Sequence, residues 1–529
     1  MRALLANMGF VLQISGIFIL IPIVVSFIYN ETQATIALFL TATAFLALGF
    51  ALNTLCEKKE LSYKQSCTLV VLVFVILSLI GSIPYFYVDT NVNILQRITD
   101  SIFESTSGFT TTGFSVIPDV SLLPKSIILY RGLTQFIGGV GIVLVLIAFF
   151  YPETKLHEFA RSMGLTKNGK VKKAITLIIT VYCGLTIALI SAGLIFGYHD
   201  IINLASIVFA ALGTGGFSPV PDITPIATQP PMNAIILVSI VLGATNFLAL
   251  AGLFKGKIKA FFNSEISVFL ALAAVSIVGV VVFFDFSVFD ATFHVLSAMS
   301  CTGFAVLSVP AFPDSLKLFF VFLMLVGGAS FSTAGGIKIF RFVLLLKATK
   351  KAIVDTVTEN DEQKIKLFGR SYTNIEVMHA AMLVLLAIAI IFVSSLVVCH
   401  YGYRPIDAIF ETTSALATAG LSAGIVSFSL ATELKWLFIF LMLLGRVEIM
   451  AFLIMFFREK NGNVNGKDTV QCKRSRHRKK NGTTKSKPKE EPAPEPPPTP
   501  QAPEDNEEAE DQTAELELQA LSDADAQLP

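Results

Sequence analysis

Charged residues are scarce in this sequence. Only 15% of its 529 residues are Asp, Glu, Lys or Arg, whereas 53% are hydrophobic and the mean hydropathy is +0.69. The first 457 residues are poorer still, with 28 basic and 24 acidic side chains among them. A folded body with so little charge cannot cover itself with solvated side chains, so it must be dissolved in lipid. This composition excludes a soluble enzyme, a secreted disulfide scaffold and a nucleic-acid-binding domain.

Paired metal ligands and cofactor motifs are also lacking. The six cysteines contain no CxxC pair and fit neither a zinc site nor a bridged framework (Cys56, Cys67, Cys183, Cys301, Cys399 and Cys472). The six histidines form no cluster, and no acid dyad is expected within the apolar segments, which argues against a membrane enzyme such as an intramembrane protease. No GxGxxG or P-loop motif occurs, so no cofactor is expected in this chain. The first apolar stretch is too long for a cleavable signal peptide.

Ten apolar stretches are long enough to cross a bilayer, which takes about 20 residues. They cover 9–29, 35–55, 67–88, 127–150, 174–197, 232–254, 265–286, 317–346, 376–399 and 434–457. Four shorter apolar stretches lie between them, at 101–111, 201–212, 290–301 and 407–418, and glycine follows each closely. Non-helical backbone at membrane depth survives only when it is buried in protein or lines a wet cavity. We therefore expect these four segments to dip into the membrane and return.

Basic residues are unequally divided between the loops. One set of loops carries 18 Lys and Arg and the opposite set carries five. The positive-inside rule predicts that the rich side and both termini are cytoplasmic, so the dipping segments enter from outside. Residues 458–529 are predicted to form a disordered cytoplasmic tail, because they are rich in charge and proline. The basic run from Lys473 to Lys489 is either solvated, the simpler interpretation, or touches anionic lipid.

The dipping segments repeat one another. DSIFESTSGFTTTGFS from Asp100 and DAIFETTSALATAGLS from Asp407 share nine residues at identical offsets. A third copy starts at Asp290 and a weaker fourth at Asn203. In every copy the Asp or Asn precedes one glycine by 13 positions, in the pairs Asp100/Gly113, Asn203/Gly216, Asp290/Gly303 and Asp407/Gly420.

The repeats predict an all-α polytopic membrane protein, with four pseudo-symmetric membrane–pore–membrane units around one pore and an N-terminal helical hairpin. The expected boundaries are 1–56 for the hairpin, 57–152 for repeat one (pore loop 100–115), 153–260 for repeat two (pore loop 203–218), 261–370 for repeat three (pore loop 290–305), 371–457 for repeat four (pore loop 407–422) and 458–529 for the tail.

This arrangement suits cation conduction. Each dipping helix should begin at its Asp or Asn, a good N-cap, and aim its partially negative C-terminus at the axis. The glycine then lets the chain return outward with carbonyls facing the passage. No carboxylate lies in these return segments, so carbonyls would replace the hydration shell of a large monovalent cation. The predicted K+ ligands are Thr111, Thr112, Gly113, Thr214, Gly215, Gly216, Cys301, Thr302, Gly303, Thr418, Ala419 and Gly420.

Three further features bear on gating and support. The stretch GGASFSTAGG breaks the helix after the third copy, and we favour a flexible intramembrane gate over tight helix packing. Its residues are Gly327, Gly328, Ala329, Ser330, Phe331, Ser332, Thr333, Ala334, Gly335 and Gly336. Arg446 in the last span either is compensated by Glu448 or faces the pore as a positive barrier; a paired structural Arg is the simpler alternative. Glu104 and Glu411 occupy equivalent positions, and we interpret them as supports behind the filter rather than ligands.

These segments resemble a known family. The four filter segments, GGASFSTAGGIK and GRVE are similar to those of Trk-type potassium transporter subunits, in the wider Trk/Ktr/HKT superfamily, over about residues 1–457. The extra hairpin points to the Trk branch. The resemblance implies a homodimer with one pore per protomer, K+ held by filter carbonyls and a gate at Gly327–Gly336 acting with Arg446. It also implies a TrkA-like cytosolic nucleotide-binding regulatory subunit in trans and residence in the inner membrane.

The transported ion and the coupling stay open at this stage. In plant relatives a Ser at the first filter glycine accompanies Na+ preference, so the four glycines here favour K+. Cys301 departs from the Thr of the other copies and leaves the innermost ion site uncertain. A Na+- or H+-coupled potassium symporter and a Na+-conducting member of the superfamily are the alternatives. Same-direction repeats with few midplane acids favour a pore over a coupled carrier.

Overall fold

The computed structural model describes residues 2–55, 61–89, 93–145, 171–254, 256, 258–262, 265–358, 365–368 and 370–456. Within these ranges the chain is helical apart from loops and one short hairpin of two strands. The tail predicted for 458–529 lies outside the described residues, as do Cys56 and Cys472. The four described cysteines are not in disulfides (Cys67, Cys183, Cys301 and Cys399).

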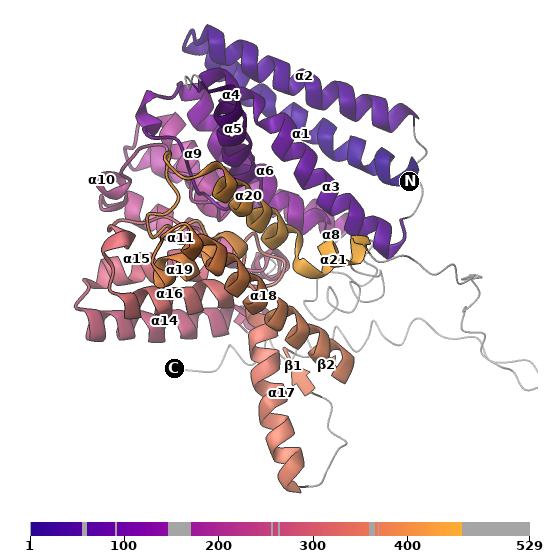
Figure 1. Cartoon of the computed structure of the whole chain (residues 1–529), viewed down its shortest axis with the longest axis vertical. Coiled ribbons are helices and arrows are strands. Elements are labelled where there is room, and N and C mark those ends of the chain that lie inside the picture. The colour runs from indigo at the N-terminus through magenta and orange to yellow at the C-terminus, as the bar shows by residue number, and fades with distance from the viewer. Residues whose placement is uncertain are drawn as a thin grey trace, which may run out of the picture. The chain divides into compact units, whose positions relative to one another are not determined.

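The predicted N-terminal hairpin consists of α1 (Arg2–Ile28) and α2 (Thr32–Leu55), which run side by side (Figure 1). Glycines allow their close approach, because a Cβ at Gly9 would lie 2.6 Å from the carbonyl oxygen of Gly49. Small residues at such crossings are typical of helix packing in membranes. Glu31, in the turn, accepts hydrogen bonds from the backbone N–H of Lys125 at 2.6 Å and of Ser126 at 3.0 Å. Glu31 thereby caps the helix that begins at Lys125, which is the inner helix of repeat one, and joins the hairpin to that repeat.

Replacing Glu31 with Gln should destabilise this junction. A hydrogen bond to a charged group contributes about 1.5–3 kcal/mol, and the neutral amide loses part of that. We expect a lower apparent melting temperature of the solubilised protein, measured by size-exclusion recovery after heating. Glu433→Gln, at an exposed position in a helix first turn, is the matched control. Equal melting of the two variants would contradict the capping role.

Four repeats follow the hairpin, as the sequence predicts. Each has an outer helix, a pore helix, a return segment and an inner helix. Repeat one contains α3 (Tyr63–Gly81), α4 (Ile83–Val88), α5 (Ile94–Phe109) and α6 (Lys125–Val145), and repeat two contains α8 (Val171–Ile195), α9 (Ile201–Leu212), α10 (Thr224–Ala227), α11 (Met232–Ala244), α12 (Phe247–Leu253) and α13 (Ile258–Phe262). Repeat three contains α14 (Glu265–Phe284), α15 (Val288–Met299), α16 (Asp314–Val326) and α17 (Ile339–Thr358), and repeat four contains α18 (Asn374–His400), α19 (Pro405–Leu416), α20 (Thr432–Val447) and α21 (Ile449–Phe456). Short 3-10 turns at Val120–Leu122 and Val309–Ala311 lie in two of the returns.

The pore helices α5, α9, α15 and α19 set the order of the repeats around an axis. Each packs against the two spanning helices of its own repeat and also against the inner helix of the preceding repeat. Thus α9 packs against α6, α15 against α11, α19 against α16 and α5 against α20. The last of these contacts closes the circle, so the four repeats surround one axis as predicted.

Three of the ten predicted spans are interrupted. The stretch 317–346 is broken at the Gly-rich loop between α16 and α17, as expected. The stretches 232–254 and 434–457 are expected from the sequence to be continuous, and this is wrong. The chain bends by 112° between α11 and α12, and by 98° between α20 and α21. Asn246 causes the first bend, because its side chain caps α12 by accepting from the N–H of Leu248 at 2.9 Å. Six described helices are long and apolar enough to span a membrane, or up to eight counting these bent pairs.

Beyond the Gly-rich loop, α17 extends away from the other helices (Figure 1). It packs against the hairpin of β1 (Ile365–Leu367) and β2 (Arg370–Tyr372), in which Ile365 lies opposite Tyr372. A small separate cluster of Leu344, Leu367 and Ala380 fixes α17 to this hairpin and to the start of α18.

Candidate functional site

Each pore helix ends in the same turn. In repeat one the N–H of Thr111 bonds the carbonyl of Gly108, and that of Thr112 bonds the carbonyl of Ser107. This is a Schellman motif, which satisfies the last carbonyls of a helix. The other repeats have the same two bonds, from Thr214 and Gly215, from Cys301 and Thr302, and from Thr418 and Ala419.

The residue that closes each turn is strained. Thr111, Thr214, Cys301 and Thr418 have φ between 49° and 55°, a left-handed conformation that usually belongs to glycine. A branched side chain there is unfavourable, by about 1–3 kcal/mol. Strain of this kind, repeated at four equivalent places and buried, is typical of a functional site.

Two residues after each strained position stands a glycine that contacts the return segment of a neighbouring repeat, and the four contacts form a closed ring. These glycines are Gly113, Gly216, Gly303 and Gly420. A Cβ at Gly113 would lie 2.0 Å from the carbonyl oxygen of Gly215, and one at Gly216 would lie 2.0 Å from that of Thr302. A Cβ at Gly303 would lie 2.2 Å from the carbonyl oxygen of Ala419. One at Gly420 would lie 1.8 Å from that of Thr112, and this contact closes the ring. All four glycines have φ between 74° and 90°. The backbones therefore approach as closely as glycine permits, and the segments carrying the twelve predicted ligands meet in one place.

The pore helices do not begin where the sequence suggested. Asp100, Asn203, Asp290 and Asp407 were expected to be N-caps, and this is wrong. Asn93, Asp200 and Ser287 cap α5, α9 and α15 through their side chains, and α19 starts after Arg404 without a side-chain cap.

Two of the displaced acids instead form ion pairs between repeats: the pair of Asp100 is buried, and that of Asp407 is partly buried. The Lys435 ammonium is 2.6 Å from Asp100, and that of Lys317 is 2.7 Å from Asp407. Each joins the inner helix of one repeat to the pore helix of the next.

Glu104 and Glu411 support the return segments, in agreement with the interpretation that they lie behind the filter. Glu104 accepts from the N–H of Val116 at 2.6 Å and pairs with Arg131 at 2.6 Å. Glu411 accepts from the N–H of Ala423 at 2.7 Å. Both carboxylates are buried, where an unpaired charge would be costly, so these bonds fix the outward path of the chain.

Sequence reasoning missed the supports of the other two repeats. In repeat three, Nε2 of His294 accepts from the N–H of Leu307 at 3.3 Å. In repeat two, Gln135 of α6 donates to the carbonyl of Gly215 at 2.7 Å and accepts from the N–H of Phe217 at 3.1 Å. His294 stands at the same offset as Glu104 and was detectable by alignment of the copies, whereas Gln135 comes from a neighbouring repeat and carries no such signal.

Changing Gln135 to Leu should weaken ion discrimination. The substitution removes both hydrogen bonds and leaves a buried N–H and carbonyl unsatisfied, at about 1–3 kcal/mol each. We expect the rubidium-to-sodium uptake ratio to fall about tenfold, given that 1.4 kcal/mol is a factor of ten. Gln229→Leu, at an exposed position, is the control. An unchanged ratio in the Gln135 variant would mean that its hydrogen bonds to Gly215 and Phe217 do not affect ion discrimination.

The Gly327–Gly336 loop lies directly beneath this ring. The N–H of Gly336 bonds the carbonyl of Ala417, next to the fourth strained turn, at 3.1 Å. On the opposite side the hydroxyl of Thr333 donates to the carbonyls of Leu212 and Gly243 at 2.9 Å. The N–H of Ala329 bonds the carbonyl of Ala244, at the break of α11 and α12. The loop thus bridges repeats two and four across the inner side of the ring.

Arg446 holds the same loop from the last span. Its guanidinium donates to the carbonyl of Thr333 at 2.9 Å and to that of Gly138 at 2.7 Å, and the side chain is buried. The alternative in which Glu448 compensates Arg446 is wrong, because Glu448 pairs with Arg341 at 2.8 Å instead. Arg446, on an inner helix of repeat four, thus links the loop to α6 of repeat one.

A family profile described as a cation transport protein, TrkH, matches residues 33–283 and 266–466. The chain belongs to the TrkH family. This confirms the resemblance inferred from the sequence, and it makes the chain a multi-pass membrane protein of a cation-transporter family rather than an enzyme.

Individual relatives agree with this membership. An uncharacterized cation transporter from Methanocaldococcus jannaschii is 32% identical over 475 residues, which are 86% of this chain and 95% of that protein. The Trk system potassium uptake protein TrkH from Escherichia coli K12 is 27% identical over 484 residues, covering 86% and 98%. The crystal structure of the potassium transporter TrkH from Vibrio parahaemolyticus has the same fold, with a TM-score of 0.76, 24% identity, and coverage of 86% of this chain and 98% of that one.

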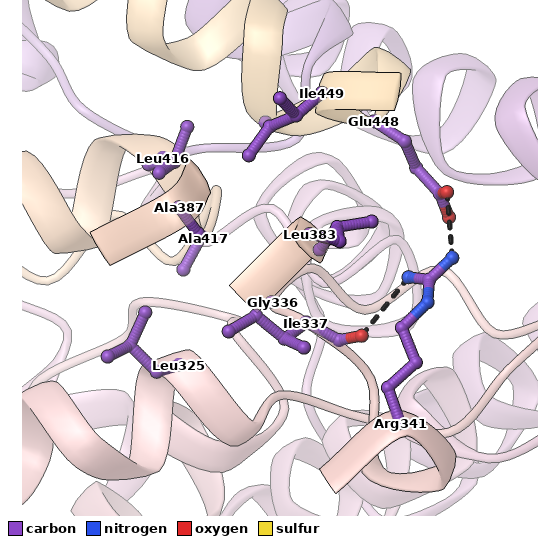
Figure 2. A pocket seen from close by; sticks show the side chains of 11 residues that line it. Leu325, Gly336, Ile337, Arg341, Leu383, Ala387, Leu416, Ala417, Glu448 and Ile449 are labelled. Carbon is purple, nitrogen blue, oxygen red and sulfur yellow. Dashed lines mark hydrogen bonds and ion pairs between the residues drawn. The ribbon is translucent and has the colours of Figure 1, made fainter. Parts of the chain in front are cut away.

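A small, partly open pocket of about 40 Å³ lies between the end of the loop and the bend between α20 and α21 in this TrkH-family chain (Figure 2). It is lined by Leu325, Gly336, Ile337, Arg341, Leu383, Ala387, Leu416, Ala417, Gly445, Glu448 and Ile449. Figure 2 shows Arg341 reaching from the start of α17 to Glu448 at the bend. Glu448 lies at the bend and has a φ of 70°, a strained conformation for a residue other than glycine.

Proposed function

We propose that this chain takes up potassium across the cytoplasmic membrane through the axial passage, with the carbonyls of the four return segments as the selectivity filter. The closed ring of glycine–carbonyl contacts carries the proposal, because it brings four oxygen-rich, acid-free segments to one axis. The negative ends of four pore helices point toward the same place, which favours a cation. Carbonyl oxygens in such a ring replace the hydration shell of a large monovalent ion.

The ligands in this proposal are the twelve residues of Thr111–Gly113, Thr214–Gly216, Cys301–Gly303 and Thr418–Gly420. The names of relatives support potassium, since the Escherichia coli protein is a potassium uptake protein. Potassium is thus the transported ion, and the chain needs no cofactor. The closed-state gate is the Gly327–Gly336 loop together with Arg446, because their contacts occupy the inner side of the ring.

The proposal extends to partners and location. The chain acts as a homodimer in the inner membrane, with both termini cytoplasmic. A TrkA-like cytosolic nucleotide-binding subunit regulates it in trans, because the chain has no nucleotide-binding motif. The excess of basic residues in the loops on one side supports this orientation.

Uptake by a potassium-import-deficient bacterium tests the function. Cells producing the chain should grow at low potassium and accumulate rubidium in preference to sodium. Purified chain in vesicles should then carry a steady potassium current without a gradient of any co-ion. Preference for sodium would contradict the ion assignment, and strict dependence on a sodium or proton gradient would favour the coupled symporter.

A further inference from the structure

Glu265 is a buried carboxylate that neither the filter nor Arg446 uses. It is the first residue of α14, and 8% of its surface is exposed. Its Oε2 accepts a hydrogen bond of 2.6 Å from the backbone N–H of Ser330, inside the Gly-rich loop. A buried ionised group is costly unless it is bonded, and charged side chains in membrane proteins usually mark functional sites.

The contact reaches the part of the loop that lies over the break in repeat two. On either side of Ser330, the N–H of Ala329 bonds the carbonyl of Ala244, and the carbonyl of Phe331 accepts from the N–H of Phe247. These neighbouring bonds join backbone to backbone. Glu265 contributes a charge-assisted bond, which is about twice as strong as a neutral one.

Glu265 lies in a different part of the fold from the other groups that form hydrogen bonds with the loop. Arg446, Ala417 and Gly243 lie on the inner helices and turns around the axis, whereas α14 is an outer helix. Helix α14 contacts α13 and α17, and the loop that precedes α14 in the sequence is one of the basic loops. Two basic residues, Lys338 and Arg341, follow the loop directly in the sequence.

We propose that Glu265 is the latch of the gate: its carboxylate holds Ser330 and keeps the loop closed until the start of α14 is displaced from the cytoplasmic side. The inference rests on the proposed gating role of the loop and deepens it by naming the group through which regulation acts. Withdrawal of Glu265 by movement of α13 or α17 removes the charged anchor and leaves only neutral backbone bonds on that side. Glu265 is a positioning residue, since it does not touch the ion.

Rubidium uptake into vesicles containing the full chain, without any regulatory subunit, tests this. Glu265→Ala should raise basal uptake about tenfold, because a hydrogen bond to a charged group is lost and each factor of ten corresponds to 1.4 kcal/mol. Glu265→Gln retains an acceptor of the same size and should give a smaller rise. The rubidium concentration for half-maximal uptake and the rubidium-to-sodium ratio should stay unchanged in both. Glu433→Ala, at an exposed position on α20, is the control and should behave as wild type.

A third variant separates the latch from the gate. Deletion of residues 330–333 removes the loop's central contacts and should raise uptake whatever anchors it. If the deletion raises uptake and neither Glu265 variant does, the latch is overturned and the gate stands. If none of the three raises uptake, the gate is overturned and the latch with it. A loss of ion preference in Glu265→Ala would show that the residue supports the filter and would also overturn the latch.

Discussion

Gly113→Ser should reduce the preference for rubidium over sodium by at least about tenfold. The new Cβ would lie 2.0 Å from the carbonyl oxygen of Gly215, a distance that no real contact tolerates, so the backbone of repeat one or two must shift. The φ of 90° adds strain for any side chain, of about 1–3 kcal/mol, and 1.4 kcal/mol is a factor of ten. The measurement is competitive uptake of the two ions by potassium-import-deficient cells.

A glycine outside the ring provides the control. Gly184 lies in α8, and nothing lies within 4 Å of a Cβ placed there, so Gly184→Ser should keep the wild-type ratio. An unchanged ratio in the Gly113 variant, at normal expression, would count against the assignment of this ring as the filter.

Deletion of residues 330–333 should raise basal flux by at least about a hundredfold. The deletion removes the hydrogen bonds that Thr333 makes with Leu212, Gly243 and Arg446, and the bond from Ser330 to Glu265. Each such bond contributes about 1 kcal/mol net, and those to charged groups contribute more, so their sum corresponds to two or more factors of ten. Selectivity should persist, because the ring of glycines is not altered. Rubidium flux into vesicles measures this.

An equal deletion within 458–529 is the control for chain shortening and should leave flux unchanged. Wild-type flux in the loop variant would mean that the loop is not a barrier. Loss of ion preference together with a rise in flux would mean instead that the loop supports the filter.

The repeat pattern in the sequence predicted most of the fold that could be predicted. Asp or Asn followed by Gly at a constant offset of 13 residues located all four return segments, because a repeated fold needs the same backbone conformation at each copy. Helix starts were misplaced for a physical reason: Asp100 and Asp407 are used in ion pairs with lysines distant in sequence, and such pairs leave no local signal. The caps Asp200 and Ser287, by contrast, stood three residues upstream of the positions chosen and fit the ordinary N-cap preference.

The breaks and the anchors were harder to predict. Hydropathy is averaged over about 20 residues, so a single Asn246 within an apolar run lowers the average only slightly, although that residue caps a new helix. Gln135 and Glu265 act on segments 80 and 65 residues away in sequence, and only the fold brings them there. Arg446 was recognisable as a buried charge, but its partners are backbone carbonyls, which no sequence pattern identifies.

The glycine ring has a consequence for how this molecule varies. All four quarters are encoded in one polypeptide, so a substitution enters the ring once, unlike in an assembly of four identical subunits, where it would enter four times. Each contact in the ring joins two neighbouring repeats, so a substitution in one repeat also alters the packing of the next. Cys301, where the other copies have Thr, is such a single departure. A ring built this way can acquire asymmetry one quarter at a time, while the other three quarters keep their original residues.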